Sequence, residues 1–111
     1  MSMPGDALME EINTAYRRLG AATEDMVRAD RELAEHVRQV RLDNAEAILE
    51  ARNERTANLY LEGLLDTDEH RHLEAGKARA GLALQQARLE VDRLQLIVRL
   101  LGTRAGEAMH G

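Results

Sequence analysis

Apolar side chains recur every three or four residues along most of the chain, with polar and charged side chains between them. This spacing is typical of amphipathic helices, because 3.6 residues per turn place such positions on one face. A short polar stretch, residues 66–69, separates two such stripes. Helices joined by a short connection usually become antiparallel neighbours. The pattern predicts an all-α fold: a long antiparallel helical hairpin, coiled-coil-like, folded about a centre near residue 66.

The stretch at the turn can begin a new helix. Asp66 or Thr67 can accept from backbone N–H groups that a first turn leaves unpaired, and Asp66 with Glu69 has the spacing of a capping box. Asp68 adds negative charge where the helix dipole favours it. Gly102 follows the last apolar position and suits a helix end. We therefore expect a turn at about 65–67 and a second helix at about 68–101.

The first helix is predicted to span about 6–64, with Asp6 as its cap. Gly20 is a weak point of this helix, although the apolar stripe passes through it in phase. Two interpretations stay open: one helix continues through Gly20, which the stripe favours, or the chain bends there. Residues 6–101 would form a single helical-hairpin domain between flexible tails at 1–5 and 102–111. The predicted hairpin core consists of Leu49, Thr56, Leu59, Leu73, Ala80, Ala87, Val91, Leu94, Val98 and Leu101.

A second helix ending near residue 101 would reach back only to about residue 32. The apolar stripe of residues 6–31 would then overhang the hairpin and need cover. A bend at Gly20 would cover part of it, and a second copy of the chain would cover it as a dimer or four-helix assembly. The residues predicted for self-association are Leu8, Ile12, Ala15, Leu19, Met26 and Leu33.

Composition narrows the class of protein. The only aromatic side chains are Tyr16 and Tyr60, and the lone proline is Pro4, as in long helices and coiled coils. The absence of cysteine excludes disulfides and thiolate metal sites. No apolar run has the length of a membrane span, which predicts a cytoplasmic protein without a membrane partner. A net charge of −5 lacks the basic excess of a general nucleic-acid binder.

Candidate chemistry is sparse, and we expect no enzyme activity and no cofactor. Glu69 and His72 have the i, i+3 spacing of helical di-iron ligands, and a dimer could bring two such Glu-x-x-His elements together. A solvated helix start is the competing interpretation. Ser2 is the sole serine, which leaves no Ser/His/Asp arrangement to argue.

Basic residues in the second helix could meet an acidic protein surface or nucleic acid. A solvated face is the favoured interpretation, because no aromatic side chain lies near them to stack on bases. This predicted partner face consists of Lys77, Arg79, Arg88, Arg93 and Arg99.

Residues 57–63, 67–71 and the Ala-rich stretch 73–83 together resemble a diffuse group of small phage-encoded helical proteins. In that group an Ala-rich helix ends in a Leu-Glu-Gly-Thr-like turn, and a capped Glu/Arg-rich helix follows. The chain departs from the pattern, with residues 64–66 inserted between Gly63 and Thr67. The resemblance covers roughly residues 40–101 and implies an accessory protein of the host cytoplasm, with no catalytic residues.

Three hypotheses follow. The first is a non-enzymatic protein–protein interaction or structural module, a self-associating helical hairpin with a phage accessory or host-modulating role. The second is a nucleic-acid-associated phage factor that uses the basic second helix. The third is a metal-binding helical oligomer.

Overall fold

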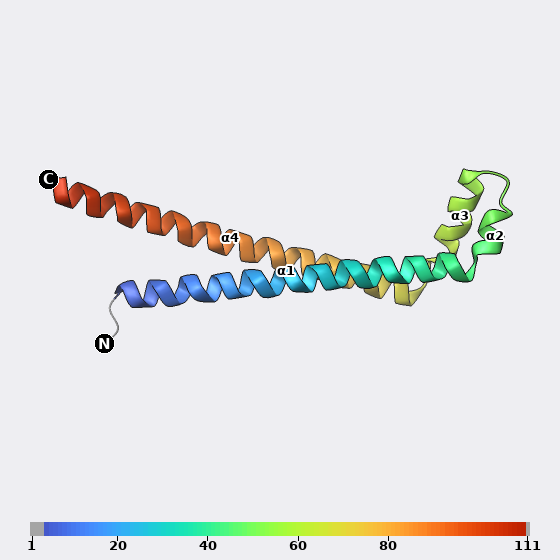
Figure 1. Ribbon diagram of the computed structural model, residues 1–111, viewed down its shortest axis with the longest axis horizontal. Coiled ribbons are helices and arrows are strands. Elements are labelled where there is room, and N and C mark those ends of the chain that lie inside the picture. Colours follow the sequence, from blue (N-terminus) through green and yellow to red (C-terminus); the bar gives the residue numbers. More distant parts are fainter. Residues whose placement is uncertain (1–3, 111) are drawn as a thin grey trace. The chain divides into compact units, whose positions relative to one another are not determined.

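The computed structural model describes the backbone of residues 4–110 and the side chains of residues 5–104. The helices are α1 (Pro4–Asp43), α2 (Ala45–Leu49), α3 (Glu54–Leu64) and α4 (Asp68–His110) (Figure 1). Residues 4–110 contain no strand. The predicted all-α fold with two long, paired helices is confirmed.

The chain divides into two compact units, which we call the terminal unit (residues 1–24 and 81–111) and the middle unit (residues 25–80). Each unit contains a segment of α1 and a segment of α4, and these segments run side by side in opposite directions (Figure 1). The middle unit also contains α2 and α3.

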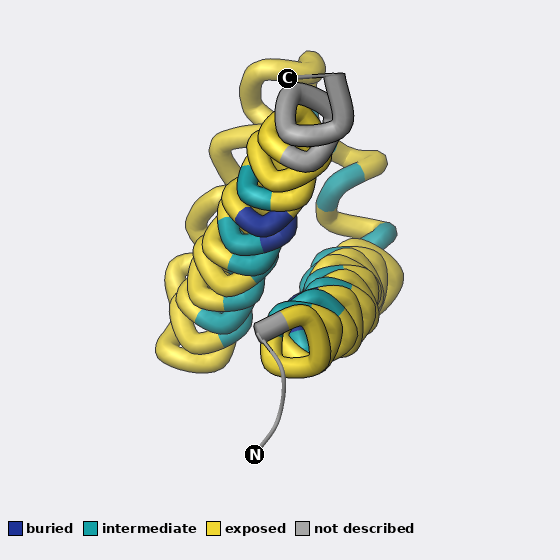
Figure 2. The backbone as a smooth tube through the Cα atoms, turned by 90° about the vertical axis from the view of Figure 1, so that its left-hand side faces the viewer, coloured by how far each residue is buried: buried dark blue, intermediate teal, exposed yellow. Residues whose placement is uncertain are grey.

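The core of the terminal unit is a narrow seam between α1 and α4. Ala15, Val91 and Leu94 form a buried cluster, with Leu94 only 2% exposed. The partly buried side chains packed against this cluster are Leu8, Ile12, Leu19 and Ile97. Buried and half-buried positions follow one side of each helix, and the remaining surface is exposed (Figure 2). Burial therefore follows the heptad-like stripe that an antiparallel helix pair requires.

In the middle unit, polar contacts join α1 to α4. Asp30 Oδ1 lies 2.9 Å from Lys77 Nζ, and His36 Nδ1 lies 3.7 Å from Glu69 Oε1. The imidazole rings of His36 and His70 face one another, with centroids 5.5 Å apart. These contacts show which residues of α1 lie beside which residues of α4 in the middle unit.

The prediction of one helix over about 6–64 is wrong, because two asparagines end and restart the helix. The Asn44 side chain donates to the Val40 carbonyl at 2.9 Å and satisfies an acceptor left free at the end of α1. Asn53 is extended (φ −157°) and its Oδ1 accepts from Thr56 N–H at 2.9 Å, which caps α3. In contrast, α1 passes through Gly20 without interruption, so no bend forms there.

This break changes the helix register. The hairpin predicted about residue 66 would have placed Asp30 near the end of α4, whereas it lies beside Lys77. Residues 44–67 form α2, α3 and their connections and are not part of the long helix pair. The long first helix is therefore shorter than predicted, and α4 packs along it as far as its first turns. The predicted overhang of residues 6–31 is therefore absent, since Leu8, Ile12 and Leu19 pack against α4.

The start of α4 rests on local hydrogen bonds. Thr67 Oγ1 accepts from the backbone N–H of His70 at 3.1 Å, so Thr67 is the cap. Asp66 instead accepts from Arg71, which also donates to Asp68, each at 2.6 Å. Bonding to these carboxylates, Asp68 first, raises the pKa of the Arg71 guanidinium.

Two predictions about the chain ends have different outcomes. α4 continues through Gly102 to His110, so residues 102–110 are helical and not the predicted tail. Gly102 has no positive φ, and glycine inside a helix costs only about 1 kcal/mol relative to alanine. Of the tail predicted at 1–5, residues 4 and 5 belong to α1, while residues 1–3, like Gly111, lie outside the described residues.

Candidate interaction surface

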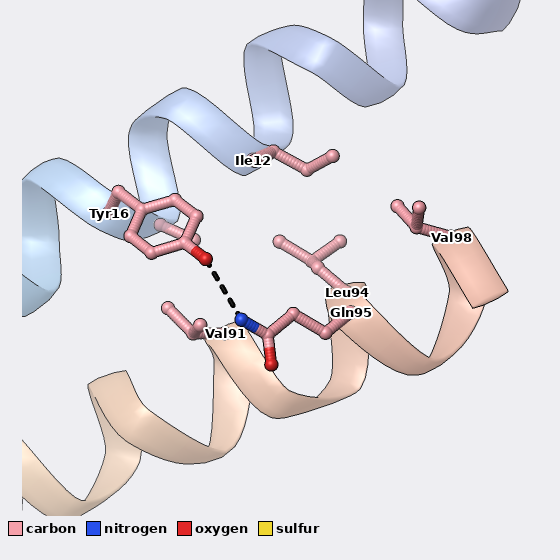
Figure 3. A pocket seen from close by; sticks show the side chains of 7 residues that line it. Ile12, Tyr16, Val91, Leu94, Gln95 and Val98 are labelled. Carbon is pink, nitrogen blue, oxygen red and sulfur yellow. Dashed lines mark hydrogen bonds between the residues drawn. The ribbon is translucent and has the colours of Figure 1, made fainter.

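The terminal unit has an apolar groove between its two helices (Figure 3). Its volume is about 210 Å³. Ile12 and Tyr16 of α1 and Val91, Leu94 and Val98 of α4 line it, together with Ala15 and Gln95. Val98, at this groove, remains 44% exposed although it continues the spacing of the buried positions Val91 and Leu94.

The polar atoms at this groove already satisfy one another. Gln95 Nε2 donates to the Tyr16 hydroxyl at 2.9 Å and so ties α4 to α1 (Figure 3). No acidic or basic side chain lines the groove. Its surface therefore suits an apolar side chain better than a charged ligand.

A charged cluster lies elsewhere on the same helix pair. Arg93 donates to Glu90 through two nitrogens, at 2.8 and 3.2 Å. These hydrogen bonds lower the pKa of the Glu90 carboxyl, with smaller attraction from Arg93 and from Arg18 of α1. The same pair raises the pKa of Arg93, which Glu11 of α1 also attracts. Opposite charges on the two helices thus support their antiparallel pairing.

The outer face of α4 carries a second apolar surface, the outer leucine stripe. Its members are each more than half exposed: Leu82, Leu89, Leu96 and Leu100. Leu89 lies two residues from both Ala87 and Val91, and two residues rotate a helix by about 200°. The stripe therefore lies on the side of α4 opposite the buried seam. Residues 82, 89 and 96 repeat every seven positions and stay on one face.

Several predicted core residues are not buried. Leu49 is 84% exposed, and Thr56 and Leu59 are also exposed, because α2 and α3 are separate short helices and not part of the long seam. Val98 and Leu101 are exposed near the end of the described side chains. The remaining members lie on the inward side of α4: Val91 and Leu94 are buried, and Leu73, Ala80 and Ala87 are half-buried.

The residues predicted for self-association have a different role within the chain. Leu8, Ile12, Ala15 and Leu19 pack against α4 of the same chain in the terminal unit. Met26 and Leu33 are half-buried in the middle unit. The seam of α1 is therefore used within the monomer, and the exposed apolar surface lies on α4 and at the groove.

Within the part of the chain that the structure describes, the predicted metal ligands Glu69 and His72 do not meet further ligands. Glu69 lies near His36, whereas His72 is exposed, and among the described side chains no group of three or more His, Asp or Glu residues could hold a metal ion. The notable histidines are His36 and His70, whose side chains are each only 14% exposed. His70 Nε2 lies 3.0 Å from Glu74 Oε1, while His36 Nε2 and His70 Nδ1 are buried and have no hydrogen-bond partner in the part of the chain that the structure describes.

The five basic residues of the predicted partner face do not form one uncompensated positive face. Lys77 pairs with Asp30 and Arg93 pairs with Glu90. Arg79, Arg88 and Arg99 are exposed. Two of the five positive charges are thus neutralised within the chain.

Sequence reasoning missed both the outer leucine stripe and the histidine pair. The stripe was detectable from the sequence, because leucine repeats every seven residues at positions 82, 89 and 96. Leu89 lies two residues from the seam residues Ala87 and Val91, which places the repeat on the opposite face of the helix. The pair of His36 and His70 was not detectable, because the sequence alone does not show which residues of α1 lie beside which residues of α4. None of the helices between residues 4 and 110 combines the length and apolar character needed to cross a membrane. The chain matches no family model, no curated protein and no solved structure.

Proposed function

We propose that this chain is a non-enzymatic protein–protein interaction module that self-associates through the apolar surface of its terminal unit. The observation that carries the proposal is the outer leucine stripe, four leucines more than half exposed on one face of α4. Exposed leucines that share one face of a helix can serve as a protein-binding site in soluble proteins.

The thin core supports the same proposal. Two packed helices bury only one stripe each, and within the described part of the terminal unit the fully buried residues are Ala15, Ala22, Val91 and Leu94. A core of this size stabilises a small fold weakly, and small helical proteins commonly add stability by oligomerising. Association of two chains would give each α4 a second apolar neighbour.

The groove adds a further site for an apolar side chain or helix from a partner. Its lining is apolar apart from Tyr16 and Gln95, whose polar groups bond to each other. Helix-in-groove recognition uses surfaces of this type. We also propose a phage accessory or host-modulating role, which rests on the resemblance of residues 40–101. In that role the chain would bind another protein in addition to a second copy of itself.

Light scattering with size-exclusion chromatography tests the proposal. At tens of micromolar we expect a mass of at least about 25 kDa, twice the monomer mass of 12.4 kDa. A constant monomer mass over that concentration range would refute self-association.

A further inference from the structure

We infer that His36 of α1 and His70 of α4 form a binding site for a divalent transition-metal ion of the kind that prefers imidazole nitrogen, and we take Zn²⁺ as that ion. Both histidines belong to the middle unit of one chain, so the inference is independent of the proposed self-association. A bound ion would tie α1 to α4 at this point of the seam.

Each histidine has one buried ring nitrogen with nothing to bond to. These inner nitrogens are His36 Nε2 and His70 Nδ1, and neither has a hydrogen-bond partner among the described residues. A buried polar atom without a partner is costly, and a bound ion is one of the few explanations for it. An imidazole nitrogen that carries no proton is a common ligand of zinc. The two inner nitrogens are therefore candidate ligands from neighbouring helices.

The other nitrogen of each ring, the outer nitrogen, faces a carboxylate. His70 Nε2 lies 3.0 Å from Glu74 Oε1, and His36 Nδ1 lies 3.7 Å from Glu69 Oε1. The Glu69 side chain is 75% exposed, so its rotation in solvent can shorten the longer contact. Histidines that bind a metal through one nitrogen commonly donate the other N–H to a carboxylate, which leaves the metal-binding nitrogen without a proton. Both rings have this arrangement.

The spacing of the rings suits a shared ion. Their centroids are 5.5 Å apart and their planes are inclined by 31°. Two imidazoles bound to one tetrahedral zinc ion have centroids about 5 Å apart, because each zinc–nitrogen bond is about 2.0–2.1 Å long. Small rotations of the two side chains would therefore bring both inner nitrogens to the ion without a shift of either helix.

The site offers two protein ligands. In the part of the chain that the structure describes, no group of three or more His, Asp or Glu residues is placed to hold a metal ion. Water or a small anion would complete the tetrahedral coordination that zinc prefers, as water does at catalytic zinc sites. With two protein ligands we expect a dissociation constant of roughly 10 µM, weaker than that of a structural zinc site with four.

Isothermal titration calorimetry and thermal unfolding with zinc chloride test the site in the full-length protein without a His tag. We expect one ion per chain, and at zinc concentrations about 100 times the dissociation constant Tm should rise by about 10 °C. His36→Leu and His70→Leu should each lose both the binding and the rise in Tm, since a single imidazole is left. Both variants should fold, because leucine suits a buried position in a helix seam.

The double variant His72→Leu/His110→Leu is the matched control, because it removes the other two histidines of the chain and keeps the pair. It should bind zinc as tightly as the wild type. Absence of zinc binding by the wild type would overturn the inference, and so would binding that survives both His36→Leu and His70→Leu. Loss of binding in the control would show that the ion is held elsewhere and would overturn it too.

Nitrogen-15 NMR of the histidine rings tests which atoms bind the ion. Zinc should shift the signals of His36 Nε2 and His70 Nδ1 to those of metal-bound nitrogen, while the outer nitrogens keep their protons. Zinc bound at the outer nitrogens would contradict the proposed site, because those atoms face the two carboxylates.

Discussion

Replacing both His36 and His70 by leucine should stabilise the protein, because it removes two buried polar atoms from the seam of the middle unit. Each side chain is 14% exposed, and His36 Nε2 and His70 Nδ1 have no hydrogen-bond partner among the described residues. The two rings face one another with centroids 5.5 Å apart, so both substitutions change the same layer between α1 and α4. The pair therefore tests the observed helix register as well as its energetics.

The magnitude follows from opposing contributions. A buried nitrogen without a partner costs about 1–3 kcal/mol, and the substitution removes two. The contacts with Glu69 and Glu74, whose carboxylates are mostly exposed, are lost, and each contributes only about 0–1 kcal/mol. The free energy of unfolding should thus rise by about 2 kcal/mol. For a chain of this size, that raises Tm by about 8 °C.

Thermal and urea unfolding, followed by circular dichroism at a fixed protein concentration, provide the assay. His72→Leu is the matched control, since His72 lies in the same helix but is exposed, and it should change the free energy of unfolding by less than about 0.5 kcal/mol. The two single variants complete a double-mutant cycle, in which we expect coupling of at least about 0.5 kcal/mol. A double variant no more stable than the wild type, or additive singles, would refute the inferred packing of this layer.

Three further substitutions test other parts of the fold. Leu94→Ala should lower the free energy of unfolding by about 2–4 kcal/mol because Leu94 is 2% exposed, whereas Leu49→Ala should change it by less than about 0.5 kcal/mol; equal effects in urea unfolding would contradict the assigned core. Gly20→Ala should increase the free energy of unfolding by about 0.5–1 kcal/mol and so raise Tm, because Gly20 lies inside α1 with no atom within 4 Å of an added Cβ. A lower Tm would argue for a bend at Gly20. Asn53→Ala should cost about 1 kcal/mol and reduce the protection of α3 amides in hydrogen exchange, since it removes the acceptor of Thr56 N–H; unchanged exchange would exclude Asn53 as the cap.

The sequence predicted the helical class and limited the cap of α4 to Asp66 or Thr67, because these features depend on local signals. A repeat of three and four residues identifies an amphipathic helix without knowledge of its partner. Thr67 lies immediately before α4 and needs only the backbone N–H of His70 to act as a cap. Such features form from residues close in the chain.

The helix register could not be predicted from periodicity, because apolar positions continue in phase through residues 45–59. Asn44 and Asn53 decide the outcome by bonding to local backbone groups, and this ends α1 at Asp43. Because the prediction missed the end of α1, it placed the centre of the hairpin many residues away from its observed position. Every predicted pair of facing residues on the two long helices is shifted as a result. Leu49 and Leu59 were therefore predicted in the core but are exposed, whereas Leu8 and Ile12 pack against the observed core.

The apolar face without a partner was predicted at the wrong place for the same reason. With the wrong register, the seam of α1 looked unpartnered and was predicted to self-associate. With the observed register that seam is covered by α4, and the uncovered leucines lie on the opposite face of α4. Periodicity shows which residues share a face, but the choice of face that remains exposed depends on long-range pairing.

Sedimentation equilibrium of the wild type and of Leu89→Glu, measured side by side from low to high micromolar concentration, tests the central claim most directly. The wild type should approach at least twice the monomer mass of 12.4 kDa as concentration rises, while Leu89→Glu should remain monomeric over the same range. A wild type that stays at the monomer mass throughout would contradict the claim that a second polypeptide covers the terminal unit.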